Sequence, residues 1–143
     1  MEKEVSARMK NRIYELSKRL TKRPGASLDV LNEVLSRLNV TPPQDYVEFM
    51  LESNGAEGPM GKDGYLMLFP AEQLEPCNKP YGLGPNGPGL VIFGSDGSTT
   101  YAFDIRDGHT GIVEVDSVSM DRGPIRLLGQ SFQEFLETLS RPE

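Results

Sequence analysis

Four short runs of β-type sequence in the second half of the chain limit the possible folds more than any other feature. They are YLMLF at 65–69, LVIF at 90–93, TTYAFD at 99–104 and GIVEV at 111–115. Asp96-Gly97 and Asp107-Gly108 follow the second and third runs, and Asp-Gly pairs favour the tight turns of β-hairpins. We therefore predict that these strands form an antiparallel meander. Alternation along the third run predicts one packed sheet face, with Tyr101 and Phe103 pointing inward.

The first half of the chain carries apolar residues at helical spacing instead. This spacing predicts an amphipathic helix over residues 2–20, which Pro24-Gly25 ends. Ser27 predicts the N-cap of a second helix. The apolar face of this helix consists of Leu28, Val30, Leu31, Val34, Leu35 and Leu38.

Two further helices have recognisable start signals. Thr41-Pro-Pro-Gln44 predicts a capping box opening a third helix at roughly 42–53, which stops at Asn54-Gly55. Ser131 to Glu134 predicts a second capping box, which opens a short closing helix.

One long segment has no regular pattern. Residues 76–89, PCNKPYGLGPNGPG, hold many helix and strand breakers and predict a long loop or flap. The order of three helices, a sheet and one helix predicts a single α+β domain, made of a basic N-terminal helix over residues 1–23 and a body over residues 24–143.

Charge is distributed unevenly along this chain of 143 residues with net charge −6. Residues 1–23 hold eight Lys/Arg against three Glu, a net charge of +5, whereas the remainder holds seven basic and 18 acidic residues, a net charge of −11. An acidic body argues against nucleic acid as the main ligand and suits a basic protein partner. No apolar run approaches the roughly 20 residues of a membrane-spanning helix. The lone Cys77 and the absence of a secretory leader favour a cytoplasmic protein with no membrane association.

The residues that could support catalysis form no convincing set. His109 is the only histidine, and nothing in the spacing brings it to Cys77. A histidine-based metal site lacks ligands, and Asp96 and Asp104 are explained by hairpin turns. The glycines of residues 82–97 are interleaved with proline and form no phosphate-binding motif. We predict no catalytic residue, no metal and no cofactor.

Two sequence blocks together resemble a known family. The run PPQDYVEFMLESNGAEG at 42–58 and the run LVIFGSDGSTTYAFD at 90–104 are similar, in order, to the signature of the SUKH superfamily of Smi/Knr-like domains. YLMLFPAEQL at 65–74 and QSFQEFL at 130–136 extend the resemblance to about residues 28–139. Pro42 departs from the family's usual Leu. The matching positions are Pro43, Tyr46, Phe49, Asn54, Gly55, Glu57, Gly58, Gly94, Tyr101, Phe103 and Asp104.

The resemblance implies an α+β domain that binds proteins. Bacterial members are chiefly immunity proteins that bind and block polymorphic or contact-dependent toxins, often nucleases, whereas fungal members resemble signalling and cell-wall regulators. We therefore expect a cognate toxin, basic in charge, as partner. An adaptor module is the second hypothesis, and a small hydrolase using Cys77 and His109 is the third. We interpret most of the matching positions as structural, and Glu57 and Asp104 as either donor-paired buried carboxylates or parts of an acidic surface.

The partner-binding surface is predicted from loop positions. Ser95, Asp96 and Ser98 form a predicted hairpin tip, and Tyr81 and Asn86 bound part of the flap. Recognition residues concentrate on loops held by a rigid sheet. Tyr81 would anchor the partner and Asp96 would steer a basic surface, unless Tyr81 simply packs the flap onto the sheet.

Overall fold

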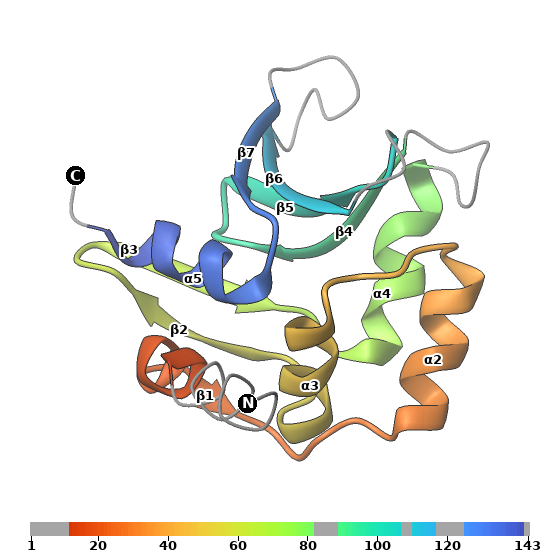
Figure 1. The fold of residues 1–143 in the computed structure, drawn as a ribbon, viewed down its shortest axis with the longest axis horizontal. Coiled ribbons are helices and arrows are strands. Elements are labelled where there is room, and N and C mark those ends of the chain that lie inside the picture. Colours follow the sequence, from red (N-terminus) through yellow and green to blue (C-terminus); the bar gives the residue numbers. More distant parts are fainter. Residues whose placement is uncertain (1–11, 82–88, 107–109, 117–124, 142–143) are drawn as a thin grey trace, which may run out of the picture.

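The computed structural model describes residues 12–81, 89–106, 110–116 and 125–141, and the side chains of all of these except residues 81 and 116. In this part of the chain, seven antiparallel strands form one sheet in strict chain order (Figure 1). The strands are β1 (Thr21–Lys22), β2 (Ala56–Met60), β3 (Gly64–Leu68), β4 (Leu90–Ser95), β5 (Thr99–Asp104), β6 (Gly111–Asp116) and β7 (Ile125–Gly129). The predicted meander is confirmed as β3 to β6, and β1, β2 and β7 extend it at both edges.

Four helices accompany the sheet, and residues 12–17 are also helical. The helices are α2 (Leu28–Arg37), α3 (Gln44–Glu52), α4 (Ala71–Asn78) and α5 (Phe132–Ser140), and a short 3-10 helix, η1 (Lys79–Tyr81), follows α4. Helix α4 packs against β4 and separates it from α2, while α3 contacts α5 (Figure 1). The predicted α+β class is thus confirmed. No helix among the described residues combines the length and apolar character that crossing a membrane requires.

An aromatic cluster forms the centre of the main core. The ring of Tyr46 on α3 makes edge contacts with Phe93, Phe103 and Phe132 at centroid distances of 5.5, 5.0 and 5.7 Å. Phe93 and Phe103 stack across β4 and β5 at 4.3 Å. These contacts join α3, α5 and the sheet, so the aromatic positions of the two sequence blocks meet in one core.

The prediction that the sheet has one packed face is wrong for its central strands. Ala102 is fully buried although it points away from the Tyr46 cluster, and it lies with Ile92 and Val113 in a second, smaller apolar cluster. Leu90 and Val115 belong to the same cluster, so the second face of β4 to β6 also buries apolar residues.

Three helix predictions also need correction. The first helix ends at residue 17 instead of continuing to Leu20, because the chain then turns into β1, whose Thr21 pairs with Glu57. On α2, Leu28 and Val30 are 50% and 48% exposed. The remaining residues of the predicted face are buried, and the last of them, Leu38, is the C-cap of the helix. The helix therefore buries a narrower stripe than its sequence predicts.

The predicted capping box of α3 is absent. Pro43 occupies the N-cap position and supplies no side-chain cap, and the Thr41 carbonyl accepts a hydrogen bond from Thr110 Oγ1 instead. A residue that precedes proline is disfavoured in the helical region, so Pro43 keeps Pro42 out of the helix.

The predicted loop at 76–89 begins later than expected. Helix α4 extends through Pro76 to Asn78, although proline removes a helical N–H and costs about 3 kcal/mol in a helix interior. The buried Asn78 side chain compensates locally: its Oδ1 accepts from Ile92 N at 2.7 Å and its Nδ2 donates to Ile92 O at 3.0 Å. Strand β3 pairs with β4 only near Gly94 and Ser95, so the Asn78 amide replaces a neighbouring strand at Ile92.

Candidate functional site

A groove lies between the β2–β3 hairpin, strands β5 to β7 and the C-terminal end of α5. Its volume is about 620 Å³. The side chains that carry charge or a hydroxyl group there are Lys62, Asp63, Tyr65, Asp96, Tyr101, Glu114, Arg126, Thr138 and Arg141. Three acidic and three basic groups therefore face a common space walled by regular elements.

Pairing within the groove leaves some of these charges available to a partner. Glu114 and Arg126 face each other across β6 and β7 and form an ion pair at 3.2 Å. Lys62 and Asp63 are exposed in the β2–β3 turn, and their side chains have no polar partner among the described residues. Free charges of both signs on a rigid hairpin can form complementary ion pairs with another protein surface.

Two tyrosines give the groove its aromatic surface. Tyr65 is exposed and donates a hydrogen bond from its hydroxyl to Glu57 Oε2 at 2.8 Å, which raises the pKa of Tyr65. Tyr101 is buried against Phe135, and burial, followed by the negative charges of Asp96 and Glu114, raises the pKa of Tyr101. Both phenols therefore stay protonated near neutral pH and can act as hydrogen-bond donors.

The predicted hairpin tip borders this groove, but its side chains are occupied with the turn itself. Asp96 Oδ1 accepts from Ser98 N at 2.9 Å and from Thr99 N at 2.6 Å. Ser95 Oγ accepts from Gly97 N and donates to Thr99 O, both at 2.9 Å. Asp96 thus both stabilises the turn and contributes charge to the groove, so reversing its charge would also disrupt the hairpin.

The flap, which is the other part of the predicted partner-binding surface, lies partly outside the residues that the structure describes. Residue 81 ends η1, and its side chain, like residue 86, lies outside the described residues. The anchoring role predicted for Tyr81 and the contribution of Asn86 therefore stay predictions. The same holds for any approach of His109 to Cys77, because residue 109 is also outside the described residues.

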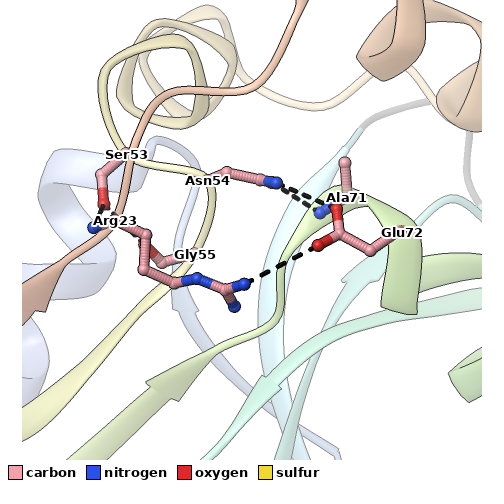
Figure 2. Close-up of polar contacts among 6 residues, drawn as sticks. All are labelled: Arg23, Ser53, Asn54, Gly55, Ala71 and Glu72. Atoms are coloured by element: carbon pink, nitrogen blue, oxygen red, sulfur yellow. Dashed lines mark hydrogen bonds and ion pairs between the residues drawn. The ribbon is translucent and has the colours of Figure 1, made fainter.

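Asn54 of the first family-like block joins helix α3 to helix α4 (Figure 2). Its Oδ1 accepts from Ala71 N at 2.7 Å, and its Nδ2 donates to Glu72 Oε2 at 2.9 Å. The N-cap residue of α4, Pro70, has no side chain that can do this, so Asn54 caps α4 from a distance. The hydrogen bond from Asn54 Nδ2 to the Glu72 carboxylate is the main cause of the lowered pKa of Glu72.

The neighbouring chain crosses the same junction (Figure 2). Arg23 donates its backbone N–H to Ser53 Oγ at 3.0 Å and places its guanidinium 3.8 Å from Glu72 Oε1. Ser53 Oγ in turn donates to Gly55 O at 2.6 Å. The block around Asn54 is therefore occupied by internal contacts that link β1, α3 and α4.

The family-like glycines fit positions where a side chain would collide with backbone. Gly55 has φ +83°, and a Cβ there would lie 2.6 Å from Leu68 O. A Cβ on Gly58 would lie 2.8 Å from Arg19 O, and one on Gly94 would lie 2.7 Å from Met67 O. These close approaches require glycine and give the three residues a structural role.

Glu57 and Asp104, the carboxylates for which the sequence left two interpretations open, both accept hydrogen bonds from side chains. Glu57 is exposed on β2 and accepts from Tyr65, beside the groove. Asp104 accepts from the backbone N–H of Arg106 at 3.1 Å and from its guanidinium at 2.9 Å, and the guanidinium hydrogen bond is the main cause of the lowered pKa of Asp104. Asp104 thus matches the donor-paired interpretation at a partly buried position.

Sequence reasoning missed most of the groove. Tyr65 lies on a predicted strand, and Glu114 is the one charged residue in the strand GIVEV. These two positions carried a signal that a strand has a face directed toward solvent. Lys62 and Arg126 carried no such signal, since strands β2 and β7 were not predicted. No group of three or more His, Cys, Asp or Glu among the described residues is arranged to hold a metal ion.

The chain matches a model of a known protein family. A family model described as SMI1 / KNR4 family (SUKH-1) matches residues 25–138, which include both family-like blocks. Five of the six charged groove residues lie within the match, at positions 62, 63, 96, 114 and 126, and residue 141 lies beyond it. No curated protein matches the chain.

Proposed function

The chain belongs to the SMI1/KNR4 family (SUKH-1), and from this premise we propose that it is an immunity-type protein that neutralises a cognate toxin by binding and occluding it. Such a function requires a shape-complementary surface and no chemistry of its own. The proposed contact surface is the groove between the β2–β3 hairpin, β5 to β7 and α5.

The observation that carries this proposal is the composition of the groove walls. Tyr65 and Arg126 are residue types that dominate the energy of many protein interfaces, and both are exposed on strands of one continuous sheet. The unpaired Lys62 and Asp63 beside them can fix the orientation of a partner. A rigid site loses little conformational entropy on binding, which favours a tight complex.

The net charge of the body of the protein, residues 24–143, supports a basic partner. Residues 24–143 carry a net charge of −11, so a cationic toxin would be attracted over a distance of about one Debye length, roughly 8 Å at physiological salt. The groove itself holds both signs of charge and would supply specificity at short range.

The test is binding of the full chain to the toxin encoded beside its gene, measured by isothermal titration calorimetry together with protection of toxin-expressing cells. We expect a one-to-one complex, with Tyr65→Ala and Arg126→Ala each weakening affinity by about tenfold or more. Arg37→Ala is the control for Arg126→Ala, because Arg37 is an arginine that forms exposed ion pairs with Glu33 and Glu75 outside the groove. Leu28→Ala controls for loss of an exposed apolar side chain.

Two results would count against the proposal. If the neighbouring genes encode no toxin and the protein protects against none, neutralisation is excluded. If affinity purification recovers several unrelated proteins that bind in the micromolar range, the adaptor hypothesis replaces it.

A further inference from the structure

A second concave site lies on a different part of the molecule, between the N-terminal helical segment and α3. Its volume is about 200 Å³. Drug-sized ligands occupy pockets of roughly 300–1,000 Å³, so this pocket suits one long side chain instead. The described residues that line it are Ile13, Tyr14, Ser17, Lys22, Asp45, Glu48, Phe49 and Glu52.

The pocket combines an apolar wall with a negative rim. Ile13 and Phe49 are buried core residues that provide the apolar wall. Glu48 and Glu52 are four residues apart on α3, so their side chains lie on the same helix face about 5–6 Å apart. Two like charges at this spacing repel each other and destabilise the helix.

No cation among the described residues neutralises these two carboxylates. Neither Glu48 nor Glu52 has an ion pair or hydrogen bond with a side chain in the described part of the chain. Lys22 lines the same pocket, but its ammonium group donates to the backbone carbonyl of Ser17.

The end of α3 adds to the negative potential. Glu52 is the last residue of the helix, and its last turn contains no basic residue. The carbonyl groups at a helix C-terminus carry a partial negative charge, which favours cations and disfavours anions. The pocket therefore concentrates negative potential beside an apolar surface.

The carboxylate of Asp45 and the hydroxyl of Ser17, which also line the pocket, are already engaged. Asp45 accepts from Phe132 N and Gln133 N, both at 2.9 Å, and Ser17 donates to Ile13 O at 2.7 Å. Glu48 and Glu52 are thus the carboxylates that can receive an external cation.

We propose that this pocket binds an arginine side chain presented by a protein partner. Arginine has an aliphatic stem that can cover Ile13 and Phe49, and a planar guanidinium with five donors that can contact two carboxylates at once. Tyr14, which is 65% exposed at the rim, can place its ring against the guanidinium. The identification of the partner as the neutralised toxin rests on the proposed function.

The first experiment tests the pocket without any toxin. The probe is the peptide acetyl-Gly-Arg-Gly-amide, titrated into the full-length protein and followed by backbone amide NMR shifts. We expect saturable shifts at residues 13, 14, 48, 49 and 52, weaker shifts with the lysine peptide, and none with the citrulline peptide, which has the same shape but no charge. Glu48→Gln with Glu52→Gln should abolish the shifts.

A matched double variant controls for net charge. Asp29→Asn with Glu33→Gln removes two carboxylates at the same four-residue spacing on α2, an exposed helix face outside the pocket, and should leave the arginine-peptide shifts unchanged. Both double variants should keep the wild-type circular dichroism spectrum and unfold cooperatively, which shows that they are folded. Equal shifts with the arginine and citrulline peptides, or no shifts with either, would overturn the proposal.

The second experiment measures the affinity of the cognate toxin for the same variants. We expect Glu48→Gln with Glu52→Gln to weaken it by about tenfold or more, since hydrogen bonds to charged groups are among the stronger ones. If the arginine peptide binds but toxin affinity does not change, the assignment of the pocket to the toxin is overturned. If wild-type protein binds no toxin, the proposed function fails, and the peptide titration still decides the pocket.

The basic N-terminal segment could supply the occupant instead. Replacing Lys3, Arg8 and Lys10 with Gln in the full chain would strengthen peptide binding if one of these side chains already filled the pocket. That result would also overturn the proposal, which expects no change.

Discussion

Replacing Asn78 with Ala should be among the most destabilising substitutions of a polar residue in this protein. Asn78 is 2% exposed, and its amide donates to Leu74 O and Ile92 O and accepts from Ile92 N. After the substitution, the N–H and C=O of Ile92 lose their partner in a part of β4 that strand β3 does not reach. An unsatisfied buried polar group costs about 1–3 kcal/mol, so the loss should be about 2–5 kcal/mol.

Asn78→Asp separates hydrogen bonding from shape. The introduced carboxylate can still accept from Ile92 N, but it faces the Ile92 and Leu74 carbonyls where the wild-type amide donates. Burial raises the pKa of such a group above the unfolded value of about 3.9, so the native state binds more protons than the unfolded state between the two values. The free energy of unfolding of Asn78→Asp should therefore fall as pH rises above about 4, relative to wild type.

The assay is reversible urea unfolding followed by circular dichroism, with the free energy of unfolding obtained by linear extrapolation. Asn32→Ala is the matched control, because Asn32 is exposed on α2 and its replacement should change stability by less than about 0.5 kcal/mol. A loss below about 1 kcal/mol for Asn78→Ala would refute the reasoning, since it would mean that Ile92 needs no partner from α4.

The remaining predictions concern the core and the helix ends, and the same unfolding assay checks each of them. Tyr46→Phe should be neutral or stabilising, within about 1 kcal/mol, because the Tyr46 hydroxyl is buried with no hydrogen-bond partner among the described residues; a loss above about 2 kcal/mol would contradict this. Asp45→Ala should cost about 2–4 kcal/mol, since Asp45 accepts from two backbone N–H groups at the start of α5, and Asp45→Asn should cost less. Phe103→Ala and Phe49→Ala should each cost about 3–5 kcal/mol because both rings are buried, and losses below about 1 kcal/mol at both would show that the inward faces are misassigned.

The sequence predicted the parts of the fold that depend on signals a few residues apart. Strand β5 has the predicted bounds of 99–104, and the Asp96-Gly97 turn before it is stabilised by Asp96 and Ser95 themselves. Helix α5 begins after Ser131, whose hydroxyl accepts from Glu134 N at 3.1 Å. In both cases, the residues that determine the structure lie within four positions of the bond they form.

Elements with weak local signals were missed. Strand β2 contains Gly58 and Pro59, which are poor strand formers, and it is held by pairing with β3 over five residue pairs. Helix α4 contains Pro76 and forms because α2 packs against it and Asn78 bonds to β4. Tertiary contacts outweigh local propensity at these positions, because each propensity term is only about 1–3 kcal/mol.

The candidate sites show the same division. The sequence placed Asp96 at a hairpin tip and gave the body an acidic charge, since both follow from residue type and local pattern. It did not bring Tyr65 and Arg126 to one groove, or Ile13 to one pocket with Glu48 and Glu52, because the residues that meet there come from separate elements. Asp45 caps a helix 87 residues further along the chain, and Asn54 caps one that starts 17 residues away. A single sequence records which groups can donate or accept, but only the packed structure decides which of them meet, since that choice depends on how the whole core excludes water.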